Sequence, residues 1–140
     1  MKYYWKSAAS GNFLTAGNWS PSGPPGVFDQ AMLTATGAFY TVTAANDLTV
    51  LTVNTSADAT LDIQGSTFTA EVGTGVGANN GTIDVEHGST FAVAGTLNNP
   101  GTINLFGSGE AAYLQLVGDT TLKGGGFIYP VTPILTEMAR

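Results

Sequence analysis

The stretch TLDIQGSTF at residues 60–68 decides the fold, because the chain repeats it. It returns at residues 82–91 as TIDVEHGSTF with one inserted residue, and its first half starts again at residues 102–105 as TINL. A weaker fourth copy is expected at residues 121–123, TLK. Same-sense copies about 20 residues apart indicate a repeat architecture in which each copy stacks on the one before.

Polar and apolar side chains alternate within each copy. Thr and Asp or Asn occupy one face, and the other face carries the apolar positions Leu61, Ile63, Ile83, Val85, Ile103 and Leu105. This period of two is typical of a half-buried β-strand. A repeat of about 20 residues is too short for a helical repeat or a propeller blade, but it suits one coil of a parallel β-helix. The sequence therefore predicts an all-β, single-domain β-solenoid whose inward ladders form the core.

Each predicted coil contains short strands joined by Gly and Asn corners. Right-handed coiling is expected, because parallel crossover connections are overwhelmingly right-handed. An antiparallel sandwich with Gly and Asn turns remains an open alternative. The expected strands are Tyr40–Thr43, Leu48–Val53, Thr82–Val85, Thr90–Val93, Thr96–Asn98, Thr102–Leu105, Tyr113–Val117 and Thr120–Leu122.

Composition restricts the possible partners. The chain has 140 residues, a net charge of −6 and four scattered basic residues, so nucleic acid and anionic membrane surfaces are not expected to bind. It has no Cys, which excludes disulfides, Cys-type zinc sites and thiol catalysis. No stretch approaches the ~20 apolar residues of a membrane span, so membrane insertion is not expected. We expect no enzymatic activity, no cofactor and no bound metal.

The two ends differ from the repeats. Residues 1–34 contain Trp5, Phe13, Trp19 and Phe28 among Gly, Asn and Pro, and they are expected to cap the first coil, with residues 35–126 forming the coils. The alternative is that Trp5 and Trp19 are exposed and stack on carbohydrate.

The C-terminal segment, residues 127–140, is apolar and contains two prolines, so it is not expected to be a central strand. We expect it either to cap the last coil or to dock on a neighbouring copy in a homo-oligomer. The surface or assembly contacts predicted from the sequence are Trp5, Trp19, Phe127, Ile128, Tyr129, Ile134 and Leu135.

Candidate chemistry falls on the outward face of the repeats. Asp62 and Asp84 occupy the same position in successive copies, continued by Asn104 and, in the weak fourth copy, Lys123. Two stacked carboxylates can bind calcium or act as acid and base, but a solvated pair is the favoured interpretation. His87 is expected at a solvated corner, since no triad or metal partners accompany it.

Two other patterns have simple structural explanations. Residues 73–77 and 124–126 are Gly-rich, but they lack the features of a nucleotide or calcium loop, so they are expected to form corners or close backbone contacts. Repeated outward Thr side chains can form the hydroxyl ladder of an ice-binding solenoid, at Thr60, Thr67, Thr82, Thr90 and Thr102. Exposed strands also favour Thr, and the Asp positions interrupt the array.

Several motifs together suggest a family. They are Trp5, GNW at 17–19, PP at 24–25, DQA at 29–31, YTVT at 40–43, LTV at 48–50, ATLDI at 59–63 and the NNGTIDV-type copies. This pattern, over roughly residues 4–127, resembles the solenoid passenger regions of large bacterial adhesins and autotransporters. Similar stretches occur in virion fibre and decoration proteins. The resemblance implies export, repetition and contact with surfaces.

Three functional hypotheses follow. The first is a non-enzymatic structural or adhesive module displayed on the outer surface of a bacterial cell, with a cell-surface glycan as a possible partner. The second is a bacteriophage virion structural protein, for which Met1-Lys2 reads as a native start and a capsid protein is the expected partner. A minor third hypothesis is a polysaccharide-binding or polysaccharide-cleaving β-helix.

Overall fold

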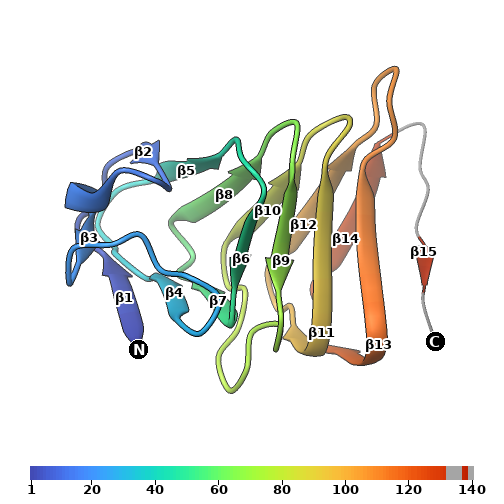
Figure 1. Cartoon of the computed structure of the whole chain (residues 1–140). Helices are drawn as coiled ribbons and strands as arrows, with labels where there is room; N and C mark the ends of the chain where they lie inside the picture. Colours follow the sequence, from blue (N-terminus) through green and yellow to red (C-terminus); the bar gives the residue numbers. More distant parts are fainter. Residues whose placement is uncertain (132–136, 139–140) are drawn as a thin grey trace.

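The computed structural model describes residues 1–131 and 137–138. Apart from the single-turn 3-10 helix η1 (Ala16–Asn18), its regular elements are β-strands. Figure 1 shows that the chain winds as stacked coils from the N-terminal end to the C-terminal end, forming about 4 turns. The predicted all-β parallel solenoid is therefore confirmed.

Sheet B carries the repeats that were quoted first. Its strands pair in parallel, so the three copies lie in register: Thr60 pairs with Thr82, which pairs with Thr102. In order across the sheet, the strands are β14 (Phe127–Val131), β12 (Thr102–Phe106), β10 (Thr82–Val85), β8 (Ala59–Ile63), β5 (Tyr40–Ala44) and β2 (Gly11–Asn12).

Sheet C forms the second face and extends around a corner. Its strands, in order, are β15 (Glu137–Met138), β13 (Tyr113–Lys123), β11 (Thr90–Asn98), β9 (Thr67–Ala70) and β6 (Leu48–Val50). Both β11 and β13 continue through a bend where two separate strands were expected. The register of their pairing shifts between Val93 and Gly95, and Gly95 has a φ of 73°, which favours glycine at this corner.

Sheet A lies at the N-terminal end of the molecule (Figure 1). Its strands, in order, are β3 (Trp19–Ser20), β1 (Lys2–Trp5), β4 (Gln30–Leu33) and β7 (Thr52–Thr55). β1 runs parallel to β4 and antiparallel to β3.

The core consists of inward side chains stacked from coil to coil. Val42, Leu61, Ile83 and Ile103 occupy successive positions of one ladder on sheet B, and all four are completely buried. The alternation in the sequence therefore predicted the inward and outward faces correctly. Burying a large aliphatic side chain contributes about 1.5–3 kcal/mol, so these ladders supply much of the driving force for folding.

The Asn and Gly corners of the repeats also form ladders. The side-chain amide of Asn79 donates to Oδ1 of Asn99 over 2.8 Å, and that of Asn99 donates to the carbonyl of Phe127 over 3.2 Å. A Cβ on Gly101 would lie 2.3 Å from the carbonyl oxygen of Gly81, so the stacked backbones leave no space for a side chain. The prediction of close backbone contacts in the two Gly-rich stretches is confirmed, since a Cβ on Gly73 would lie 2.1 Å from the Thr96 carbonyl oxygen and one on Gly126 would lie 2.2 Å from that of Gly101.

An aromatic cluster closes the N-terminal end. The ring of Trp19 packs edge-on against Trp5 at 5.1 Å and against Phe13 at 4.9 Å, and Phe13 continues to Phe68 of β9 at 5.5 Å. Trp5 is 4% exposed and Trp19 is fully buried. This corrects the expectation of Trp5 and Trp19 as surface contacts, because their rings cover the first coil instead.

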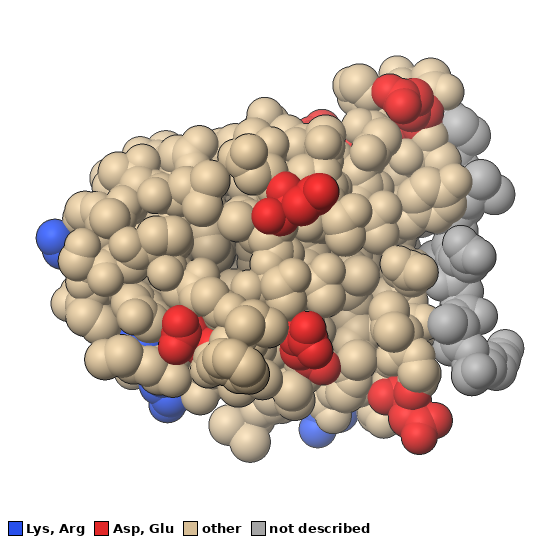
Figure 2. Space-filling view, in the orientation of Figure 1, with Lys and Arg blue, Asp and Glu red and all other residues tan. Residues whose placement is uncertain are grey.

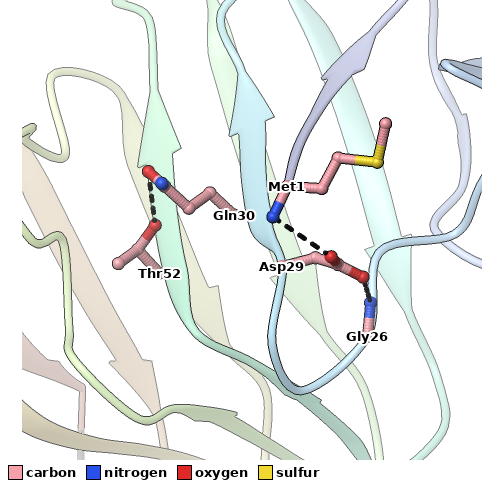
Figure 3. Close-up of polar contacts among 5 residues, drawn as sticks. All are labelled: Met1, Gly26, Asp29, Gln30 and Thr52. Atoms are coloured by element: carbon pink, nitrogen blue, oxygen red, sulfur yellow. Dashed lines mark hydrogen bonds and ion pairs between the residues drawn. The ribbon is translucent and has the colours of Figure 1, made fainter.

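Polar contacts attach the cap to the sheet beneath it. Figure 3 shows Asp29 contacting the amino group of Met1 at 3.4 Å and accepting a hydrogen bond from the Gly26 N–H at 2.9 Å. Next to it, Thr52 Oγ1 donates to Gln30 Oε1 over 3.4 Å. These contacts hold the turn at residues 26–29, directly before β4, against the start of the chain.

The structure corrects the sequence analysis at two places on the coils. Residues 121–123 are not a fourth copy of the sheet B strand, since Thr121 pairs with Thr96 on the face that follows the bend. The expected single strand Leu48–Val53 is divided at Leu51 between β6 of sheet C and β7 of sheet A. In both places the chain turns a corner, although the strand-forming residues continue without a break in the sequence.

The last rung of sheet B comes from the C-terminal segment. β14 pairs with β12, so the ladder extends five residues beyond the expected end of the coils at Gly126. Phe127 donates its N–H to the Gly101 carbonyl, so the alternating Ile128 and Pro130 direct their backbone groups toward the free edge. Pro130 has no N–H to leave unpaired there, which is how proline is accommodated in an edge strand.

Candidate functional site

The register of sheet B brings acidic side chains together on its outward face. Asp62 of β8 pairs with Asp84 of β10, and Glu86 follows two residues later on the same face. One carboxylate oxygen from each of these three residues lies within 4.8 Å of the others. We call Asp62, Asp84 and Glu86 the carboxylate cluster.

Amide side chains hold two members of this cluster. Asn104 Nδ2 donates to Asp84 Oδ1 over 2.9 Å from the next coil, and Gln64 Nε2 donates to Asp62 Oδ2 over 2.7 Å. Oδ1 of Asp62 is buried and has no donor among the described residues unless Glu86 carries a proton. The arrangement therefore favours a protonated Glu86.

The surroundings change the acidity of the cluster. A hydrogen bond with Asp62, partial burial and the charges of Asp62 and Asp84 raise the pKa of Glu86 to about 7. Burial also raises the pKa of Asp84, and the charge of Asp62 adds to this, while the hydrogen bond from Asn104 opposes it. Carboxylates this close cannot all ionise freely near neutral pH, because like charges repel.

A hollow of about 550 Å³ adjoins the cluster at the corner between sheets B and C. His87 and Glu110 face each other there, with Nδ1 and Oε1 separated by 3.9 Å, and both side chains are mostly exposed. The prediction of His87 at a solvated corner is confirmed. The hollow is lined by Gln64, Gly65, Glu86, His87, Gly88 and Glu110.

This site can share a proton between coils and can offer oxygen atoms to a cation. Carboxylate and amide oxygens suit hard cations, but exposed acidic groups are common without one. Figure 2 shows acidic groups separated from one another on the visible face, with basic groups at its margins. Lys123 does not extend the acidic ladder as expected, because it pairs with Asn98 on sheet C; the position after Asn104 is held by Tyr129.

The C-terminal end is the second candidate site. Phe127, Ile128 and Tyr129 are 58%, 37% and 48% exposed, so these predicted contact residues do lie at the surface. The rings of Phe127 and Tyr129 stack at 5.3 Å with an angle of 12° between their planes. Ile134 and Leu135, predicted as further contacts, lie outside the described residues.

A smaller hollow of about 200 Å³ opens beside these residues, where the core reaches the end of the stack. Its apolar lining comes from Leu97, Leu122 and Ile128, and Asn99, Lys123, Gly125 and Gly126 complete it. Its size suits a single apolar side chain.

Sequence reasoning missed Glu86 as a member of the carboxylate cluster. The signal was present, since Glu86 lies two residues after Asp84 and therefore falls on the same face of an extended chain. The role of Glu86 depends on Asp62 of the neighbouring coil, and Asp62 comes close to it only because β8 pairs with β10.

No family model, curated protein or solved structure matches this chain. In the part of the chain that the structure describes, no helix is long and apolar enough to cross a membrane. The fold and the two candidate sites are therefore the basis for any functional conclusion.

Proposed function

We propose that this chain is a non-enzymatic structural or adhesive β-solenoid module displayed on the outer surface of a bacterial cell, where copies join through their C-terminal ends. One observation carries the proposal: among the described residues, buried aromatic rings cover the N-terminal end, whereas apolar side chains remain exposed at the C-terminal end. Trp19 is fully buried in the N-terminal cap, whereas Ile128 of the last rung is 37% exposed.

The faces of the stack suit contact with surroundings in water. Thr41, Thr60, Thr82 and Thr102 form a continuous outward column on sheet B. Only 10% of the residues in the chain are charged, so hydroxyl and amide groups supply most of the polar surface. A regular polar face on a rigid stack is an appropriate surface for an adhesive or scaffolding module.

The open end supports association between copies. Exposed apolar groups gather there on Leu122, Phe127, Ile128 and Tyr129, beside the hollow that can receive an apolar side chain. A second copy approaching end to end would cover the same residues on both chains, as in a two-fold dimer. The sealed N-terminal end disfavours a head-to-tail filament, because it offers no complementary open coil.

The association is tested by replacing the two outward aromatic residues of β14 with the residues that occupy the same positions in the neighbouring strand β12. Phe127 pairs with Thr102 and Tyr129 pairs with Asn104, so the double variant Phe127→Thr, Tyr129→Asn preserves the strand and removes both rings. Sedimentation velocity should show an oligomer for the unchanged chain and a monomer for this variant. The matched control is Tyr4→Thr, which removes an exposed ring from the sealed end and should leave the oligomer intact.

Two results would oppose this part of the proposal. A monomeric unchanged chain at all concentrations would exclude self-association, and an oligomeric double variant would show that the rings of Phe127 and Tyr129 do not form the contact. Location is tested separately with antibodies raised against the folded chain. Labelling of intact source cells supports surface display, whereas labelling of purified virions alone would assign the module to a virion.

A further inference from the structure

The corner before β10 contains the one Asn-Gly pair of the sequence, Asn80-Gly81. Such a pair can modify itself without an enzyme. The Gly nitrogen loses its proton and bonds to the side-chain carbonyl carbon of Asn, the bond from that carbon to the amide nitrogen breaks, and the nitrogen leaves as ammonia. Water then opens the resulting succinimide ring to give aspartate or isoaspartate. Glycine favours the attack, since no Cβ obstructs its nitrogen.

The structure exposes the reacting side chain but restrains the attacking nitrogen. Asn80 is exposed at the surface. Its own N–H donates to the Thr55 carbonyl over 3.1 Å, and the Gly81 N–H donates to Thr55 Oγ1 over 3.1 Å in a buried contact. Thr55 Oγ1 in turn donates to Oδ1 of Asn79. Both peptide groups flanking Asn80 are thus bonded to the coil beneath.

Packing restrains the same nitrogen a second time. The backbone of Gly81 lies so close to the previous coil that a Cβ there would be 2.2 Å from the Ala59 carbonyl oxygen and 2.3 Å from that of Ser56. Bringing the Gly81 nitrogen onto the Asn80 side chain requires rotation of the peptide between them. That rotation breaks the bond to Thr55 and lifts Gly81 away from its packing.

We infer that Asn80 is a latent deamidation site that the closed coil protects, and that it reacts in molecules whose Thr55–Asn79–Asn99 ladder has opened. Local opening of this kind costs free energy, so it suppresses the reaction in proportion to the rarity of the open state. The modification would then mark coils that have opened and accumulate in proteins that remain in place for a long time.

The two products have different consequences. The corresponding corner position is Pro100 in the next coil and Gly125 in the last, as the stacking of Gly81, Gly101 and Gly126 shows, so the fold does not need an amide there. Aspartate at this position leaves the backbone unchanged. Isoaspartate adds a backbone atom directly before Gly81, which the tight packing against Ala59 and Ser56 cannot accommodate.

The first test follows deamidation of the full chain at mildly alkaline pH, in buffer and in denaturant, by mass spectrometry of the peptide that contains Asn80. We expect the reaction to be slower in the folded chain by at least about tenfold. Equal rates in buffer and denaturant would overturn the inference. This comparison uses the unchanged protein, so it remains decisive if a variant fails to fold.

The second test compares two buried threonines. Thr55→Val removes the acceptor of the Gly81 N–H, whereas Thr74→Val removes a buried hydroxyl that bonds Thr96 and Asn98 and does not contact Asn80. Deamidation of folded protein should accelerate several-fold in Thr55→Val and change little in Thr74→Val. Equal acceleration in both variants would attribute the effect to general destabilisation and contradict the role of Thr55.

The products supply a third readout. The variant Asn80→Asp should melt at the same temperature as the unchanged chain, and purified chain carrying isoaspartate at position 80 should fail to regain native circular dichroism after dilution from denaturant. Full refolding of the isoaspartate form would contradict the packing argument at Gly81.

Discussion

The two ends of the solenoid use aromatic residues in opposite ways. At the N-terminal end, Trp5, Phe13 and Trp19 pack edge to face, and the indole N–H of Trp19 donates to the Phe13 carbonyl over 2.7 Å. At the C-terminal end, Phe127 and Tyr129 stack beside each other on the outward face and remain about half exposed. The difference teaches that aromatic content alone does not make a cap. At the N-terminal end the rings pack into the core of the first coils, as the contact between Phe13 and Phe68 shows, whereas at the C-terminal end they lie on the outward side of β14.

The largest predicted effect contrasts the middle and the end of one core ladder. Ile83 and Ile128 occupy the same ladder, but Ile83 is fully buried and Ile128 is 37% exposed. Ile83→Asp should unfold the central coils, because it buries a charge without a partner and costs more than the roughly 2–5 kcal/mol of an Ile→Ala change. Ile128→Asp should be much milder, because water reaches the end of the stack. Urea unfolding measures both, and an unchanged midpoint for Ile83→Asp would show that the register is wrong.

The next effect compares the aromatic residues of the two ends. Trp19→Ala should lower the free energy of unfolding by about 3–5 kcal/mol, because it empties the centre of the cap and removes a buried hydrogen bond. Tyr129→Ala should cost about 1 kcal/mol or less, as is usual for exposed side chains. Thermal melting at low protein concentration separates these values from any effect of association. Similar losses for the two variants would show that both ends are sealed.

A smaller effect distinguishes the stacked glycines of the coils from those of the cap. Gly101→Ala places a methyl group 2.3 Å from the Gly81 carbonyl oxygen and should cost about 1–3 kcal/mol through overpacking. Gly17→Ala is the matched control, since nothing lies within 4 Å of its Cβ position in η1. Denaturant titration should show destabilisation at Gly101 and little change at Gly17. Equal stability for the two variants would contradict the close stacking of the corners.

The smallest predicted effect lies between the two ends, at the carboxylate cluster. Folding raises the pKa of Glu86 from 4.5 to about 7, so the folded chain binds more protons than the unfolded chain between these values. Stability contributed by this group is complete below pH 4.5 and is lost as the pH rises toward 7. Melting temperatures measured from about pH 4 to pH 8, at intervals of about one pH unit, should therefore decline less in Glu86→Gln than in the unchanged chain.

Two companion variants sharpen the same measurement. Glu71→Gln changes an exposed glutamate of the loop that follows β9 and should retain the full decline. Asp84→Asn should be neutral or slightly stabilising near neutral pH, because it removes one of the repelling charges next to Asp62. An identical pH profile for Glu86→Gln and Glu71→Gln would mean that the cluster does not bind an extra proton in the folded state.

Much of the fold could be predicted from the repeats at Thr60, Thr82 and Thr102, because pairing between equivalent strands keeps the copies in register. The same reasoning assigned Thr121 to the wrong face. A pattern of Thr followed by an apolar residue is favourable on every face of a coil, so the local sequence does not identify the face. The candidate site was predicted in part, through Asp62 and Asp84, whereas the participation of Glu86 depended on distances between coils.

The sequence by itself determined the strand type, the inward and outward faces and the corner residues, because alternation and glycine placement act locally along the chain. The tertiary structure decided which end is sealed, where strands bend between faces and which carboxylates meet. These features depend on the stacking of coils, which brings together residues about 20 positions apart in the chain, and on whether an aromatic side chain points into the core or away from it. Trp19 and Tyr129 illustrate the point, since one is buried and the other exposed for reasons that neither residue's neighbours in the sequence reveal.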